Sequence, residues 1–119
     1  MRFTTSMICV ASLAGIAMPA LADHGGYSGA LRTILTQTAA GSCAAELMAP
    51  RLLSACQEQL PRLKASLAGL GPIRSIAFVN AAKHKGKRVE TYKVTFAKGD
   101  TVTWHIGDLN GGKYESVYS

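Results

Sequence analysis

The sequence predicts a small α+β domain in which N-terminal helices pack on a curved four-stranded antiparallel sheet. Up to Leu70, apolar residues recur every three or four positions, as they do on one face of a helix. After Gly71-Pro72 they alternate with polar residues, as in strands with one buried face. A run of helices followed by a run of strands favours helices that cover one face of an antiparallel sheet.

The first 22 residues have the pattern of a cleavable secretory signal. Met1-Arg2 provides a positive start, and the apolar stretch "MICVASLAGIAM" is too short to span a bilayer. Ala20-Leu21-Ala22 offers the small residues that signal peptidase requires. We therefore expect residues 1–22 to be removed, leaving residues 23–119 as one exported domain with no membrane span. The periplasm is the expected destination, and secretion is the alternative.

Cys43 and Cys56 form an even pair in the expected mature chain, which in an exported protein predicts a disulfide. Such a bond closes a loop of about 14 residues and stabilises the fold by roughly 3 kcal/mol. A metal site is the alternative, but no further Cys or His ligands lie nearby in the sequence. We predict no metal and no cofactor here.

Three helices are expected between residues 27 and 70. The first ends near Gly41. Its apolar face is formed by Tyr27, Leu31, Ile34, Leu35 and Thr38. The segment "SCAAELMAP" predicts a short helix with Ser42 as N-cap and Pro50 as its limit. A leucine-rich stripe predicts the third helix, with a kink or a fresh start at Pro61. This stripe comprises Leu52, Cys56, Leu60, Leu63, Leu67 and Leu70.

Four strands are expected between residues 73 and 118, within the segments "IRSIAFVNA", "RVETYKVTFA", "TVTWHIG" and "KYESVYS". Lys98-Gly99-Asp100 and Asn110-Gly111-Gly112 predict the last two turns, because Gly and Asn tolerate positive φ. The stretch "KHKGKR", with Gly86 at its centre, is then the connection between the first two strands.

Several segments resemble small exported domains of the cystatin-like, nuclear transport factor two-like (SnoaL-like) superfamily. The matching residues are Leu60-Pro61, Leu70-Gly71-Pro72-Ile73, Tyr92-Lys93-Val94, Trp104 and Gly111-Gly112-Lys113. The resemblance covers roughly residues 27 to 118. It implies a cone-like sheet wrapped around the helices, often with a pocket between them, and often a homodimer formed through the sheet. The superfamily includes isomerases, dehydratases, ligand-binding subunits and protein-interaction modules, so the fold alone does not assign an activity.

Four aromatic residues of the predicted strands are candidates for a ligand site: Tyr92, Trp104, Phe96 and Phe78. They either build the core beneath the helices or line a pocket for a small apolar ligand. Tyr92 and Trp104 are the polar-tipped side chains expected on this face, so we expect no catalytic acid or histidine there. Tyr114 and Tyr118, on the last strand, can instead mark an edge or a dimer surface.

The basic hairpin is formed by Lys83, His84, Lys85, Lys87 and Arg88. It is either a charged loop that discourages edge-to-edge aggregation or a contact site for an acidic protein partner. Formal net charge of +6 is compatible with either interpretation. Export, and the lack of aromatic residues in the loop, argue against a nucleic acid partner.

No constellation of residues predicts catalysis strongly. His105 has Asp100 and Asp108 nearby in the sequence, but alternation places it opposite Trp104, on the outer face. Glu46 and Glu58 are interpreted as solvated carboxylates, and Asp23 with His24 as a weak metal site. We therefore expect a non-enzymatic binding or interaction module. The alternatives are a small isomerase-type or hydrolase-type pocket enzyme, and an inhibitor or regulator of an envelope enzyme.

Overall fold

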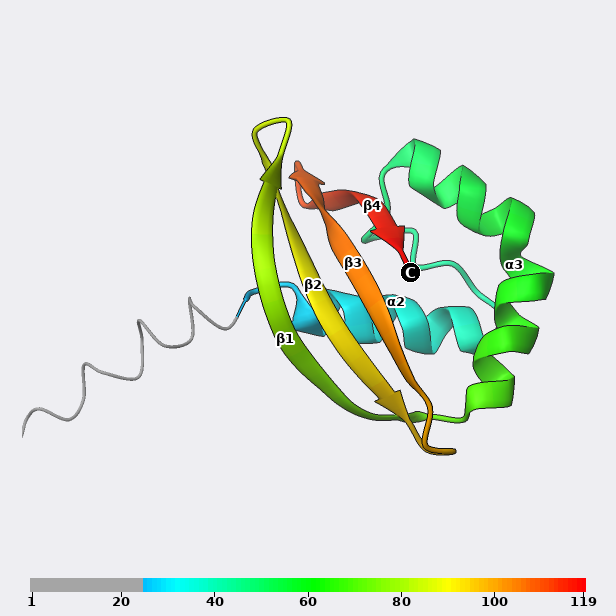
Figure 1. The fold of residues 1–119 in the computed structure, drawn as a ribbon. Coiled ribbons are helices and arrows are strands. Elements are labelled where there is room, and N and C mark those ends of the chain that lie inside the picture. The colour runs from blue at the N-terminus through cyan, green and yellow to red at the C-terminus, as the bar shows by residue number, and fades with distance from the viewer. Residues whose placement is uncertain (1–24) are drawn as a thin grey trace, which may run out of the picture.

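The computed structural model describes residues 25–119 (Figure 1). The predicted signal peptide, Asp23 and His24 lie outside the described residues. The order of elements confirms the α+β class, with helices before strands. The elements are α2 (Ser28–Ala39), α3 (Pro50–Leu70), β1 (Ile73–His84), β2 (Lys87–Phe96), β3 (Thr101–Asn110) and β4 (Lys113–Tyr118). Within this part of the chain, neither helix combines the length and the apolar character needed to cross a membrane.

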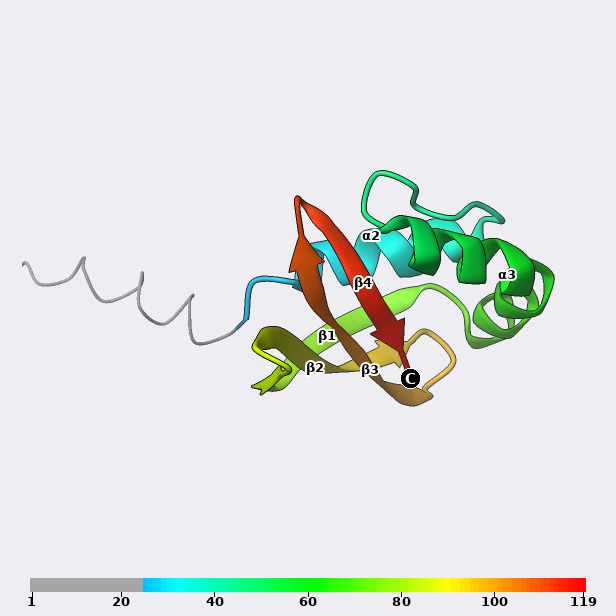
Figure 2. The same cartoon turned by 90° about the horizontal axis from the view of Figure 1, so that it is seen from above.

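The four strands form one antiparallel sheet in the order β1-β2-β3-β4, as the alternation predicted. Figures 1 and 2 show a strongly twisted sheet with both helices on the same side. Tyr92 in the middle of β2 lies opposite Phe78 of β1 and Trp104 of β3. The β1–β2 connection is a two-residue turn, in which Lys85 and Gly86 both have positive φ, as the favoured hairpin turn requires.

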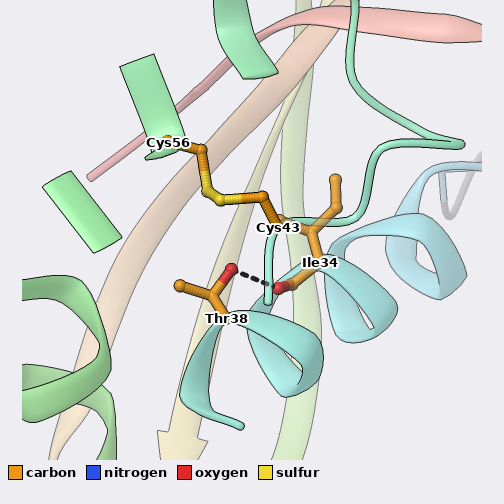
Figure 3. Close-up of a disulfide and its surroundings, with 4 residues drawn as sticks. All are labelled: Ile34, Thr38, Cys43 and Cys56. Carbon is orange, nitrogen blue, oxygen red and sulfur yellow. Dashed lines mark hydrogen bonds between the residues drawn. A yellow bond between two sulfur atoms is a disulfide. The ribbon is translucent and has the colours of Figure 1, made fainter. Parts of the chain in front are cut away.

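The buried face of α2 consists of Leu31, Ile34, Leu35 and Thr38, as its spacing predicted. These side chains join Tyr92, Val94 and Phe96 of β2 and Ile106 of β3 in a single core cluster. The hydroxyl of Thr38 donates to the carbonyl oxygen of Ile34 at 2.7 Å, which satisfies the hydroxyl inside the core (Figure 3).

The short helix predicted over Ser42 to Pro50 is wrong. This segment contains a turn and a parallel β-bridge between Met48 and Tyr114 of β4. The amide of Ala49 donates to the Tyr114 carbonyl at 2.9 Å, and the Tyr114 amide donates to the Leu47 carbonyl at 2.8 Å. Pairing with β4 therefore replaces helical hydrogen bonds, and it lets Met48 reach the core. Pro50 is the first residue of α3 instead of a limit, a position that suits its missing N–H.

Pro61 lies inside α3, which continues through it as one helix, so a fresh helix start at this position is wrong. The predicted kink is present, since the axis of α3 changes direction along its length in both views (Figures 1 and 2). Proline cannot donate the helical hydrogen bond to the carbonyl four residues earlier, and its ring crowds that carbonyl, so the helix bends.

Cys43 and Cys56 are joined by a disulfide, as predicted, with 6.2 Å between their Cα atoms (Figure 3). The bond ties the segment after α2 to the middle of the N-terminal half of α3. Cys56 is buried in the core cluster, and Cys43 packs against it. The disulfide therefore fixes α3 beside a segment that has no regular structure of its own.

Replacing both cysteines, as Cys43→Ala with Cys56→Ala, should lower the free energy of unfolding by about 3 kcal/mol, because the unfolded chain regains loop entropy. Urea unfolding of the oxidised wild type and of the double variant measures this difference. Dithiothreitol should destabilise the wild type by a similar amount and leave the variant unchanged. Equal stability of the oxidised wild type and the variant would contradict a structural role for the bond.

Candidate functional site

A cavity of about 340 Å³ lies between the helices and the last two strands. We call it the Trp104 cavity. Its walls include Leu52, Ala55, Gln59 and Leu63 of α3, Trp104 of β3 and Val117 of β4. The volume falls at the lower end of the range of about 300–1,000 Å³ that is typical of small-molecule sites.

The indole Nε1 of Trp104 is buried and has no hydrogen-bond partner among residues 25–119. It is the one buried side-chain nitrogen or oxygen of the described chain in this condition. Because an indole N–H can only donate, it requires an acceptor, and buried donors nearly always have one. Trp104 thus brings a buried donor that has no acceptor to the wall of the Trp104 cavity.

A second cavity of about 340 Å³ lies near the carboxyl end of β2, with Phe96, Pro72 and Ile73 among its walls. Leu35 and Leu67 contribute to both cavities. The structure thus does not gather the four predicted ligand-binding aromatics around one site. Trp104 lines the first cavity and Phe96 the second, whereas Tyr92 and Phe78 line neither.

Tyr92 belongs instead to a polar cluster centred on Glu90, whose side chain is fully buried on the inner face of β2. The Tyr92 hydroxyl donates to Glu90 Oε1, and Arg88 Nε donates to Oε2 at 2.6 Å. The amide of Gly26 lies 3.1 Å from both oxygens, and the amide of Tyr27 donates to Oε1 at 3.0 Å. We call these five residues the Glu90 cluster.

The expectation that no acid faces inward on the strands is wrong, because Glu90 does so. The signal for it was in the sequence: Glu90 precedes Tyr92 by two positions, and alternate residues of a strand share a face. A lone buried carboxylate is costly, so Glu90 needs partners that offset its loss of hydration. The partners that offset this cost come from Arg88 and from Gly26 and Tyr27, far away in the sequence.

Burial opposes ionisation of Glu90, but the hydrogen bonds from Tyr92, Arg88, Gly26 and Tyr27 outweigh it and hold the pKa of this carboxyl below its usual value. Burial, reinforced by the neighbouring Glu90 carboxylate, raises the pKa of the Tyr92 hydroxyl. The hydrogen bond to Glu90 likewise raises the pKa of Arg88. At neutral pH the cluster is thus a carboxylate paired with a guanidinium and a neutral phenol. Arg88 and Tyr92 keep their protons, and Glu90 stays ionised.

The five residues of the basic hairpin are all exposed. Arg88 belongs to the Glu90 cluster, and Lys87 Nζ lies 3.8 Å from the carboxylate of Glu115. Within residues 25–119, neither Lys83 nor Lys85 has an acidic partner. The unpaired positive charge therefore concentrates at the tip of the hairpin, which extends past the end of β3 in Figure 1.

The structure does not pair His105 with an aspartate. Its Nδ1 lies 2.9 Å from the hydroxyl of Thr91, and its ring stacks on Tyr118 with 4.7 Å between centroids. Asp108 instead accepts a hydrogen bond from Ser116 at 2.5 Å. His105 is therefore held between a hydroxyl and an aromatic ring, as part of a cross-strand packing contact.

The other residues singled out from the sequence form no catalytic group among the described residues. Glu46 is exposed and accepts a hydrogen bond from Gln37 at 3.2 Å, and Glu58 is exposed. Tyr114 is buried against the ring of Tyr27, so it is not an exposed edge, whereas Tyr118 is 52% exposed. Across residues 25–119, no three His, Cys, Asp or Glu side chains lie close enough to hold a metal ion.

In comparisons with known proteins, no family model, no curated protein and no solved structure matches the chain. A function is therefore proposed from the sequence and from this geometry.

Removing one hydroxyl tests the Glu90 cluster. Tyr92→Phe should lower the free energy of unfolding at neutral pH by about 1–2 kcal/mol, since Glu90 loses a buried donor. Because a hydrogen bond that lowers the pKa of Glu90 is lost, the acid-induced loss of stability should also begin at higher pH. Tyr118→Phe, at an exposed position, is the matched control and should change neither quantity. Urea unfolding across a pH series measures both, and identical profiles for the two variants would contradict the cluster's role.

Proposed function

We propose that this protein is an exported, non-enzymatic binding module that takes a small, neutral, largely apolar ligand in the Trp104 cavity. The observation that carries the proposal is the buried Trp104 Nε1, a donor with no acceptor among the described residues. A carbonyl or ether oxygen of the ligand supplies that acceptor. Satisfying a buried donor in this way contributes to affinity and fixes the orientation of the ligand.

The walls of the Trp104 cavity support a neutral ligand. They are mainly aliphatic and aromatic, and their polar side chains are the uncharged Thr38, Gln59, Tyr118 and Ser119. No Asp, Glu, His, Lys or Arg of residues 25–119 is among them. A charged ligand that enters this cavity loses its hydration, and no charged side chain of the walls compensates for that loss.

We further propose that the domain is a cystatin-like cone of the nuclear transport factor two-like type. The support comes from the residues that resemble this superfamily and from the order of the elements. The Trp104 cavity also lies between helices and sheet, where that resemblance implies a pocket. Export is supported by the signal-like pattern of residues 1–22 and by the Cys43–Cys56 bond, which suits an oxidising compartment.

Binding is favoured over isomerase or hydrolase chemistry by the position of Glu90. This fully buried acid is absent from the walls of the Trp104 cavity. Its two oxygens already accept hydrogen bonds from Arg88, Tyr92, Gly26 and Tyr27. A general base needs a free oxygen within hydrogen-bond reach of a substrate, and Glu90 offers none in this arrangement.

A matched pair of probes tests the proposal, because the chain has one tryptophan and therefore one indole N–H signal in a ¹H–¹⁵N spectrum. Acetophenone, which carries a carbonyl acceptor, should move that signal downfield in a saturable way. Ethylbenzene, of similar shape but without the acceptor, should bind more weakly by about 1 kcal/mol, roughly fivefold, and should not produce this downfield shift. If neither probe perturbs Trp104 or the residues around it, the cavity does not bind this class of ligand.

Filling the cavity provides the control variant. Ala55→Leu adds volume to a wall of the Trp104 cavity and should reduce acetophenone affinity at least tenfold. Ala65→Leu makes the same change at an exposed position of the same helix and should leave affinity unchanged. Equal effects of both substitutions would place the binding elsewhere.

The basic hairpin supports a second function, an electrostatic contact with an acidic protein. An envelope enzyme that this protein inhibits or regulates is one such partner. The observation in its favour is the pair of exposed lysines, Lys83 and Lys85, that have no acidic partner among the described residues. Such a contact raises association rates and weakens as salt increases.

Immobilised poly-L-glutamate serves as the acidic probe for the hairpin. The double change Lys83→Gln with Lys85→Gln should elute at clearly lower salt than the wild type. Lys93→Gln with Lys98→Gln removes the same charge from exposed positions outside the hairpin and should have the smaller effect. Equal shifts for the two variants would show that net charge, and not the hairpin, determines retention.

A further inference from the structure

The two edges of the sheet differ in how they are covered. At the β4 edge, the amide of Ala49 and the carbonyl of Leu47 bond to the backbone of Tyr114, so the segment before α3 occupies that edge. The other edge is β1, a strand of 12 residues that pairs with β2 on one side. Within residues 25–119, no backbone hydrogen bond joins β1 to any other element. The amides and carbonyls on its outer side can therefore pair with another chain.

One part of this open edge is regular. The register between β1 and β2 skips Val79, so β1 has a bulge there. From Asn80 to His84, every residue faces one residue of β2, and this stretch leads directly into the turn of the basic hairpin. Figure 1 shows this end of β1 at the outer margin of the sheet. We call residues 80–84 the hairpin edge.

The hairpin edge is exposed and positively charged. Asn80, Ala82, Lys83 and His84 are exposed, and Lys85 follows in the turn. Among the described residues, neither lysine has an acidic partner. The strand itself contains no Asp or Glu. Unpaired backbone groups and uncompensated positive charge are therefore found at the same place.

We propose that the hairpin edge binds an extended, acidic segment of a partner protein, which adds to the sheet as a further strand beside β1. The inference deepens the second function proposed above and rests on it, because the same lysines provide the charge. In strand addition, main-chain hydrogen bonds provide affinity and side chains provide specificity. An acidic residue opposite Lys83, with another toward Lys85, matches the charges of this edge.

Charge disfavours a second copy of this chain as the occupant. If Asn80–His84 pairs antiparallel with the same stretch of a copy, with Ala82 opposite Ala82, the two Lys83 side chains lie diagonally on one face. Lys85 adds further positive charge, and each chain has a formal net charge of +6. Like charges across a pair of strands are destabilising, whereas an acidic segment replaces this repulsion with attraction. Charge complementarity therefore selects the acidic partner.

Three synthetic peptides test the proposal on the full mature chain. The first alternates Val and Thr and has Glu at both ends. The second is the same peptide with N-methyl groups on all central amides, so it keeps its charge but cannot pair along either edge. The third has Lys in place of Glu. The first should shift the ¹H–¹⁵N signals of residues 80–84 in a saturable way and slow amide exchange there. The other two should bind more weakly by about tenfold.

The outcomes separate strand addition from the function on which it rests. Equal binding of the first two peptides would overturn strand addition and leave a purely electrostatic hairpin contact. Equal binding of the first and third would overturn the preference for acidic segments. If the first peptide does not bind while poly-L-glutamate still retains the protein, strand addition is wrong and the hairpin contact stands. If neither probe binds, both proposals are wrong. Protection of residues 80–84 that grows with protein concentration alone would make a second copy the occupant and overturn the proposal.

A matched pair of variants locates the binding site. Lys83→Gln with Lys85→Gln should weaken binding of the Glu-ended peptide by about fivefold, since two exposed charge pairs are lost. Lys93→Gln with Lys98→Gln makes the same charge change at exposed positions outside the hairpin and should have the smaller effect. Equal losses in both variants would show that net charge determines binding and would overturn the assignment to the hairpin edge.

Discussion

The carboxylate of Glu90 is removed from water on the inner face of β2, and it must find all of its hydrogen-bond partners inside the protein. Much of the N-terminal architecture follows from this requirement. Arg88 folds back along its own strand to pair with it, and Tyr92 turns its hydroxyl toward it. The other donors are backbone amides at Gly26 and Tyr27, so the chain must pass over β2 before α2 can begin.

This arrangement also places a negative charge at the start of α2. The first turn of that helix contains no acidic residue and has no side-chain cap, so it lacks the usual compensation for its dipole. The carboxylate of Glu90 supplies a charge of the right sign from β2. One buried acid therefore links residues 26 and 27, at the start of α2, to the sheet.

The opposite side of the domain is organised by covalent and backbone pairing. The Cys43–Cys56 bond and the Met48–Tyr114 bridge hold the irregular segment between the helices against α3 and β4. With α3 bent at Pro61 and fixed in this way, the Trp104 cavity stays open between helix and sheet. The inner face of the sheet thus borders two different regions: a cavity without charged side chains in its walls beside Trp104, and the Glu90 cluster beside Tyr92.

The sequence by itself determined the α+β class and the faces of α2 and β2, through periodicity, and the hairpin turns, through Gly and Asn. It also determined the disulfide, because the expected mature chain has a single cysteine pair. Tertiary structure decided what contacts between distant segments control. Residues 42–49 pair with β4 instead of forming a helix, because Tyr114 offers them backbone partners. Glu90 can be buried because the amides of Tyr27 and Gly26, 63 and 64 positions away, donate hydrogen bonds to it. Tyr92 and Trp104 are neighbours in register, yet they belong to different regions. Tyr92 packs in the core and bonds to Glu90, whereas Trp104 lines the cavity beside α3.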